Sequence, residues 1–142
     1  MYASVVLDAS VWVSWLRSPD IKHEASEIWL DQYIAREGLL VEPALLLIGV
    51  AASVSRQTGQ SMRAKEAINT LRSISKIQIV PLDSVLVQVA VDAAIDLQLR
   101  AGDSIYVALA HRLNIPLVSW DKEQLQRARS LIVTFTPDSY VF

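Results

Sequence analysis

Three aspartates stand at the points where short apolar segments of the chain end or begin. Asp8 and Asp121 each follow a short apolar run, and Asp103 precedes a longer one. If the three carboxylates converge, their like charges repel and raise their pKa values unless a cation lies between them. A divalent cation would relieve that repulsion, activate a water molecule and neutralise the charge that develops on a phosphodiester during cleavage. These residue types therefore favour metal-assisted phosphoryl transfer.

The positions of the aspartates in the expected fold strengthen this interpretation. In an open parallel sheet, ligands bind beyond the carboxyl ends of the strands, where the strand order reverses. Asp8 ends the first predicted strand and Asp121 the fourth, and Asp103 can reach the same edge from the start of its helix. Each aspartate alone could instead be the N-cap of the helix beside it, a common role for this residue type. Their order along the chain favours one shared site.

The composition restricts the kind of site that the chain can build. A chain of 142 residues, 52% of them hydrophobic, fits a single domain over residues 1–142 with a buried core. The absence of cysteine excludes disulfides and thiolate metal sites. Two histidines, His23 and His111, are too few for a histidine-rich zinc site, and we expect surface or packing roles for them. A metal would therefore be held by carboxylate and water, which favours Mg²⁺ or Mn²⁺.

Charge and hydropathy indicate a soluble, cytoplasmic protein with no membrane association. No signal-peptide pattern opens the chain. The longest uncharged stretch, residues 43–55, is shorter than the roughly 20 residues of a membrane helix. The net charge of −2 gives no global attraction to nucleic acid, but basic residues dominate one segment. That segment is either a solvated face or a site that attracts a phosphate backbone. In that segment Arg56, Arg63, Lys65, Arg72 and Lys76 outnumber Glu66.

Short apolar runs alternate with longer amphipathic ones, which predicts parallel strands joined by right-handed crossovers. The predicted strands cover residues 4–8, 38–42, 77–80, 116–120 and 131–135. The predicted helices cover residues 10–17, 21–36, 44–58, 62–75, 84–99, 103–113 and 122–128, and Pro43 suits the first turn of the third. Alternating valines between Val85 and Val91 are typical of a strand, but Pro81, the candidate cap Asp83 and nearby alanines favour a helix there.

Four tryptophans offer rings on which bases could stack. Trp12, Trp15 and Trp29 lie at helical spacing among aliphatic residues, which favours packing in the core or in an interface. Trp120 is next to Asp121 and is the better candidate to face the site.

Five segments of the chain resemble one protein family, in that family's order and spacing, and together they span nearly the whole sequence. The segments are Val6-Leu7-Asp8-Ala9-Ser10, His23-Glu24-Ala25, Pro43-Ala44-Leu45-Leu46, Gly102-Asp103-Ser104-Ile105-Tyr106-Val107-Ala108-Leu109-Ala110 and Leu117-Val118-Ser119-Trp120-Asp121. The chain resembles a PIN domain, and most of all the VapC-type toxin ribonucleases of bacterial toxin–antitoxin pairs.

The resemblance implies an α/β fold, a three-layer sandwich whose parallel sheet has the strand order 3-2-1-4-5. It implies an endoribonuclease that depends on Mg²⁺ or Mn²⁺, with Asp8, Asp103 and Asp121 holding the metal. Ser10 and Ser119 would support the site, and water would attack phosphorus in line, leaving a 5′-phosphate and a 3′-hydroxyl. The implied partners are RNA as substrate, an antitoxin protein that blocks the cleft, and a second copy of the chain in a homodimer.

The sequence departs from this family at Gly49. The family carries a glutamate six residues after the proline of the third helix, and glycine stands six residues after Pro43. Glycine within a helix costs about 1 kcal/mol relative to alanine, and it offers no ligand to a metal. Glu42 precedes Gly49 by seven residues, roughly 10 Å along a helix, so we expect Glu42 to be a solvated carboxylate rather than a substitute. The metal site should therefore be weakened.

Three functional hypotheses remain. The leading one is a metal-dependent ribonuclease toxin with a weakened site at Gly49. The first alternative is a catalytically degenerate PIN-fold module that binds RNA or a protein partner. The second is an acidic-pocket α/β domain of another class, such as a receiver-like phosphoacceptor. Against the second, no acidic pair precedes the first strand and no lysine follows the fifth.

Overall fold

The structure is a computed structural model that describes residues 1–142, and it contains a single five-stranded parallel sheet. The strands are β1 (Ser4–Leu7), β2 (Leu39–Pro43), β3 (Ile77–Val80), β4 (Leu117–Val118) and β5 (Thr134–Phe135). The helices are α1 (Ala9–Leu16), α2 (His23–Ala35), α3 (Leu45–Thr58), α4 (Ser61–Ser73), α5 (Ser84–Leu97), α6 (Ala101–Leu113) and α7 (Lys122–Ala128), followed by the short 3₁₀ helix η1 (Pro137–Ser139). The strand order β3-β2-β1-β4-β5 confirms the predicted fold.

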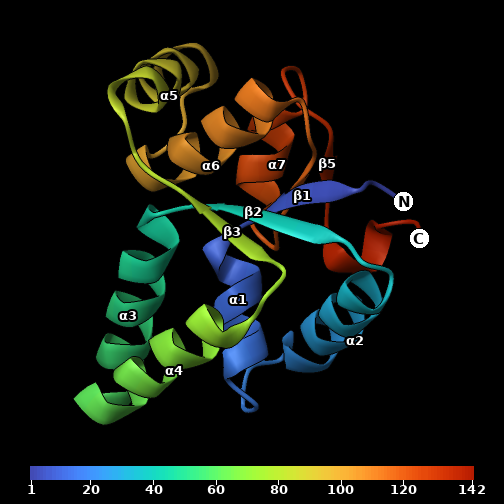
Figure 1. The fold of residues 1–142 in the computed structure, drawn as a ribbon. Coiled ribbons are helices and arrows are strands. Elements are labelled where there is room, and N and C mark those ends of the chain that lie inside the picture. The colour runs from blue at the N-terminus through green and yellow to red at the C-terminus, as the bar shows by residue number, and fades with distance from the viewer.

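Helices cover both faces of the sheet, as Figure 1 shows, and alternate strand residues enter two separate cores. Val5 and Leu7 of β1 pack with α1 to α4 in one core. Val6, between them, packs with α5, α6 and α7 in the other. Both cores are lined by fully buried aliphatic side chains, so the central strand has no exposed face. None of the helices is long and apolar enough to span a membrane.

Several element boundaries differ from the predicted ones for local reasons. The strands β4 and β5 have only two residues each. After β4 the Trp120 backbone N–H donates to the Ser10 hydroxyl oxygen, and before β5 the N–H groups of Leu131 and Ile132 close a turn onto the Ala128 carbonyl. Pro43 pairs with Val80 at the end of β2 and does not open α3. The valine-rich segment is helix α5, whose N-cap Asp83 accepts a 2.8 Å hydrogen bond from the Leu86 backbone N–H.

The carboxyl ends of β1 and β4 meet at the edge of the sheet where the candidate site lies. The register pairs Leu7 with Val118, so the residues that follow these strands leave the sheet at the same level. The Asp8 backbone N–H donates a 2.9 Å hydrogen bond to the Val118 carbonyl, which ties the start of α1 to β4. This is the point where the strand order reverses, and ligands of open parallel sheets bind at such points.

Candidate metal centre

Asp8 lies at the junction between β1 and α1, and only 6% of its surface is exposed. It is the N-cap of α1, because its Oδ2 accepts a 3.0 Å hydrogen bond from the Ser10 backbone N–H. Its Oδ1 accepts a longer hydrogen bond, of 3.3 Å, from Nε2 of Gln124. Donors from two different helices therefore fix the orientation of this carboxylate.

Two serine hydroxyls join the ends of β1 and β4. The Ser119 hydroxyl donates to Oε1 of Gln124 at 2.9 Å and accepts from the Asp121 backbone N–H at 2.9 Å. The Ser10 oxygen accepts from the Trp120 backbone N–H at 3.1 Å and lies 3.3 Å from the Ser119 oxygen. Because the Ser119 proton is directed to Gln124, Ser10 is the donor between the two serines. These contacts give both serines a positioning role, whereas their part in catalysis stays a prediction.

Gln124 is the residue that connects all three aspartates, and it is 99% buried, with 1% of its surface exposed. Its Nε2 donates to Oδ1 of Asp8 and, at 3.5 Å, to the backbone carbonyl of Asp103. Its backbone N–H donates to Oδ1 of Asp121 at 3.1 Å. Sequence reasoning missed this residue. The Asp-x-x-Gln spacing from Asp121 to Gln124 is that of a helix capping box, and the side chain instead turns toward Asp8.

Asp103 lies in the first turn of α6 and is partly buried. The N-cap of α6 is Arg100, so Asp103 does not cap its own helix. Burial, followed by the charges of Asp8 and Asp121, raises the pKa of Asp103 to about 6, while Arg100 opposes the shift. The charges of Asp8 and Asp121 therefore act on Asp103 in addition to its burial.

Asp121 is the N-cap of α7, just as Asp8 is the N-cap of α1. The capping interpretation is therefore right for these two aspartates and wrong for Asp103. Capping and convergence are compatible, because the helix ends that the aspartates cap meet at the same edge of the sheet.

Glu42 occupies the floor of the site, and the expectation that it is solvated was wrong. Its side chain is completely buried, and its Oε1 accepts a 2.9 Å hydrogen bond from the Leu7 backbone N–H. The carboxyl group thus takes the place of a backbone acceptor where β1 separates from β2. Burial raises the pKa of Glu42 well above its usual range, against the hydrogen bond from Leu7 and the nearby Trp12 indole, and the charge of Asp8 adds to the rise.

Three buried polar atoms near this floor have no hydrogen-bond partner of standard geometry. They are Oε2 of Glu42, Nε1 of Trp12 and the hydroxyl oxygen of Tyr106. Burial raises the pKa of Tyr106, and the charges of Glu42, Asp8 and Asp103 raise it further. The carboxylate cluster therefore rests on a polar, incompletely satisfied layer and not on aliphatic packing.

Gly49 lies in the interior of α3, beside the cluster but without a carboxylate to offer. It borders a hollow of about 400 Å³ together with Ser10 and Trp120. A Cβ added at Gly49 would meet no atom within 4 Å, so space does not require glycine at this position. Its φ lies outside the left-handed region as well, so the backbone does not require glycine there.

The residue types at this edge suit a hard divalent cation, although they do not form a closed set of ligands. Carboxylate and hydroxyl oxygens are the donors that Mg²⁺ and Mn²⁺ prefer. Burial contributes most to the raised pKa of Asp103, and the charges of Asp8 and Asp121, which a cation would relieve, add to the rise. As the side chains are placed, no three acidic or histidine residues are close enough together to hold an ion. The Gln124 amide takes up part of the coordination space beside Asp8.

The remaining sequence candidates have the packing roles expected of them, except for Trp120. Trp12 and Trp29 are buried. His23 contacts the Ser14 carbonyl through Nδ1 at 3.0 Å, and His111 is exposed. Trp120 is partly buried, and it borders the hollow at the site.

Comparison with known proteins agrees with the fold. The sequence matches the PIN domain family over residues 5–130, and a search of curated protein sequences finds no match. Among solved structures, VapC20 of Mycobacterium tuberculosis, described as a toxin that cleaves the sarcin–ricin loop, has a TM-score of 0.70 at 14% identity. The match covers 84% of this chain and 92% of VapC20.

Two other solved structures are similar to the same extent. FitAcB of Neisseria gonorrhoeae has a TM-score of 0.72 at 16% identity, covering 96% of this chain and 99% of its own. The DNA-bound VapBC of Salmonella typhimurium has a TM-score of 0.71 at 11% identity, covering 96% of this chain and 99% of its own. At these identities the likeness shows a shared fold.

The family match covers most of the chain, and PIN domains are typically Mg²⁺-dependent nucleases. The strand order and the acidic edge at the carboxyl ends of β1 and β4 agree with that match. The chain belongs to the PIN domain family.

Proposed function

We propose that this PIN domain is a metal-dependent endoribonuclease and the toxin component of a toxin–antitoxin pair, with a site weakened at Gly49. The observation that carries the proposal is the set of contacts that Gln124 makes with all three aspartates. Its side-chain amide donates to Oδ1 of Asp8 and to the Asp103 backbone carbonyl, and its backbone N–H donates to Oδ1 of Asp121. The three aspartates come from segments remote along the chain, and the capping of α7 explains only the contact with Asp121. The similarity to VapC20, described as a toxin that cleaves the sarcin–ricin loop, supports the same reaction class.

In this proposal Asp8, Asp103 and Asp121 hold Mg²⁺ or Mn²⁺ and are the catalytic residues. A bound divalent ion would activate water and neutralise charge on the phosphodiester. The chain's own residues position the carboxylates. Ser10 orients Asp8 through its backbone N–H, and Ser119 fixes the amide that faces Asp8.

The proposed protein partners are an antitoxin and a second copy of the chain. Similar solved structures include a toxin–antitoxin complex from Klebsiella pneumoniae. Apolar side chains at the early helices, Ile21 at 95% exposure and Ile28 at 51%, offer contact area for a partner.

A second candidate function is a degenerate PIN module that binds RNA or a protein and cleaves RNA poorly. Two observations favour it. Gly49 leaves open space where the family has a carboxylate, and no ready set of three ligands exists.

Cleavage of RNA by the purified protein with Mg²⁺, with Mn²⁺ and with EDTA separates the two functions. The nuclease proposal expects metal-dependent cleavage that Asp8→Asn abolishes. Cleavage that survives Asp8→Asn would come from a contaminant and would remove the support for this site. No cleavage with either metal, in a folded protein that binds RNA, would favour the degenerate module.

A further inference from the structure

Two adjoining hollows run along α3 away from the carboxylate cluster. The first, of about 400 Å³, begins at Ser10 and Trp120. The second, of about 470 Å³, shares Gly49, Ser53 and Gln57 with the first. Because three residues of α3 line both hollows, they form a continuous depression. One of its lining residues is Ser10, whose backbone N–H donates to Asp8.

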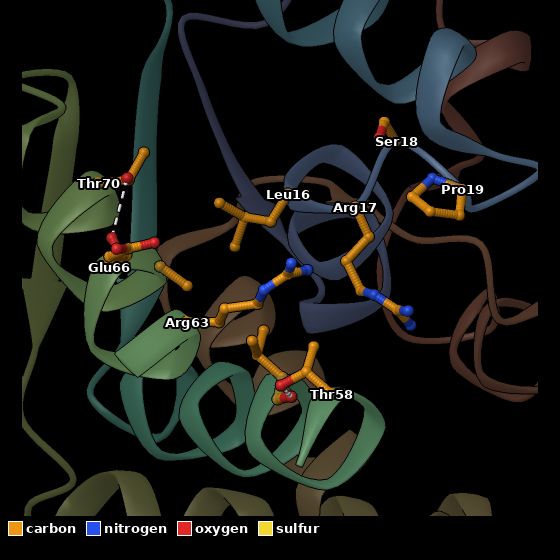
Figure 2. Close-up of a pocket in the computed structure, with 10 residues that line it drawn as sticks. Leu16, Arg17, Ser18, Pro19, Thr58, Arg63, Glu66 and Thr70 are labelled. Atoms are coloured by element: carbon orange, nitrogen blue, oxygen red, sulfur yellow. Dashed lines mark hydrogen bonds between the residues drawn. The ribbon is translucent and has the colours of Figure 1, made fainter. Parts of the chain in front are cut away.

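A third hollow, of about 430 Å³, lies between the end of α1, the end of α3 and α4. Figure 2 shows Arg63, on α4, extending across it toward Leu16 and Arg17 at the end of α1. The Arg17 guanidinium donates a hydrogen bond to Gln57, which lines the first two hollows. The hydrogen bond between Arg17 and Gln57 places the third hollow next to the first two, and we call the surface of the three neighbouring hollows the α3 track.

Four cationic side chains border the α3 track. Arg17 and Arg63 line the third hollow, Arg56 lines the second, and Lys22 lines the first, with its Nζ 4.2 Å from the centroid of the Trp120 ring. None of the four belongs to an ion pair, since the ion pairs of the molecule use other basic residues.

Two carboxylates, Asp20 and Glu66, also line the track, and neither is ion-paired. Four cations against two carboxylates leave the track positive on a molecule whose net charge is −2. Gly49 contributes to this balance, because a glutamate there would add a negative charge between Ser10 and Gln57. Two basic residues of the neighbouring segment lie off the track: Lys76 pairs with Glu37, and Arg72 borders a different, apolar hollow.

We propose that the α3 track binds the phosphate backbone of a single-stranded RNA segment that leads to the carboxylate cluster. The inference rests on the proposed function for its substrate class. Hollows of this size accommodate unstacked nucleotides, and proteins read RNA mostly in unpaired segments whose bases can leave the stack. Guanidinium groups suit the track because they bind phosphate through paired N–H donors.

The test measures RNA binding without cleavage. The full-length protein in EDTA is titrated against a labelled single-stranded RNA oligomer, with fluorescence anisotropy as the readout, between 50 and 200 mM KCl. Each phosphate contact on a single strand adds about 0.7 to the log–log salt slope, so four contacts predict an affinity loss of about 50-fold over this range. Removing two contacts predicts a loss of only about 7-fold.

The test variant is the double substitution Arg17→Gln and Arg63→Gln, which should show the smaller salt dependence and weaker binding at 50 mM KCl. A second variant, Lys22→Gln with Arg56→Gln, should do the same and guards against a folding defect in the first. The matched control removes two positive charges of the same segment outside the track, through Lys65→Gln and Arg72→Gln, and should keep the slope of the unmodified protein.

Equal salt slopes in both track variants and in the control would overturn the proposal. So would equal affinity for a duplex of the same length, or binding of an acidic peptide in place of RNA. The outcome is separable from that of the nuclease assay. If the protein cleaves RNA and a track variant keeps both its salt slope and its KM, the track proposal is refuted and the nuclease proposal stands. If the protein does not cleave RNA but the track variants change the salt slope, the nuclease proposal is refuted and the track proposal stands.

Discussion

Restoring the missing carboxylate through Gly49→Glu should strengthen both α3 and the metal centre. An added side chain meets no atom within 4 Å of its Cβ, so the substitution needs no repacking. Gly49→Gln is the matched control, because it has the same length and hydrogen-bonding reach without the charge. Gly49→Ala is a second control that reports helix propensity alone.

The effect on stability follows from the helix interior. Replacing glycine with alanine in α3 should raise the free energy of unfolding by about 1 kcal/mol, and glutamine or glutamate by slightly less. For a chain of this size, 1 kcal/mol corresponds to a rise in Tm of about 2–4 °C. In EDTA the glutamate variant should be less stable than the glutamine variant, because a fourth carboxylate joins three that already repel. In excess Mn²⁺ that order should reverse.

The effect on chemistry should be larger than the effect on stability. Ligand-shell residues typically change metal affinity by about 10–100-fold, and a positioned acid–base group changes rate by about 10²–10⁴-fold. Isothermal titration with Mn²⁺ and single-turnover cleavage of RNA measure the two effects separately. Equal Mn²⁺ affinity and equal cleavage for Gly49→Glu and Gly49→Gln would refute the reasoning that the site is weakened by the loss of an acid at this position.

Three further predictions concern residues around the cluster. Gln124→Leu should lower the free energy of unfolding by about 1–3 kcal/mol, because buried partners lose their hydrogen bonds, and Gln126→Leu, on the exposed side of the same helix, should not; chemical denaturation compares them. Glu42→Gln should keep the acceptor for the Leu7 N–H and preserve Mn²⁺ affinity within about threefold. Glu42→Leu should lower Mn²⁺ affinity by about 10–100-fold, as substitutions of other residues that orient ligands do. Because the pKa of Asp103 is raised to about 6 from an unfolded value near 3.8, the folded protein holds the proton more tightly, so stability in EDTA should fall as the pH rises from about 4 to 6 and then level off. Asp103→Asn should remove about 1 kcal/mol of that fall in stability, a figure reduced for solvent screening. Thermal unfolding at pH 4.5 and 7 measures the difference, and an identical pH dependence in the variant would contradict the raised pKa of Asp103.

The sequence predicted the fold more completely than it predicted the site. Apolar runs of strand length alternate with amphipathic ones, and that pattern predicts a parallel sheet. The prediction does not depend on the side chains at the edge of the sheet. It placed Asp8 directly after β1 correctly. Asp121 does not end β4 but follows it after Ser119 and Trp120, as the N-cap of α7.

The surroundings of the aspartates could not be predicted in the same way. Glu42 lies near the end of β2, just before a helix, so local rules place it in solvent, and only the separation of β1 from β2 creates the space that buries it. Gln124 carries the spacing of a helix cap, and its contact with Asp8 depends on the packing of α7 against the end of β1. Such contacts arise from tertiary geometry and leave no periodic pattern in the chain.

The dual role of the aspartates determines which substitution tests the metal centre. Asp8 and Asp121 cap helices and also line the proposed site, so alanine would remove a cap worth about 1 kcal/mol together with the charge. Asparagine caps a helix about as well as aspartate does, and its side-chain oxygen can still accept from the Ser10 N–H. Asp8→Asn should therefore keep its Tm within about 2 °C in EDTA while losing the rise in Tm that Mn²⁺ gives the unmodified protein. A rise in Tm with Mn²⁺ that is the same for both proteins would place the ion elsewhere, because the carboxylate would then contribute nothing to binding it.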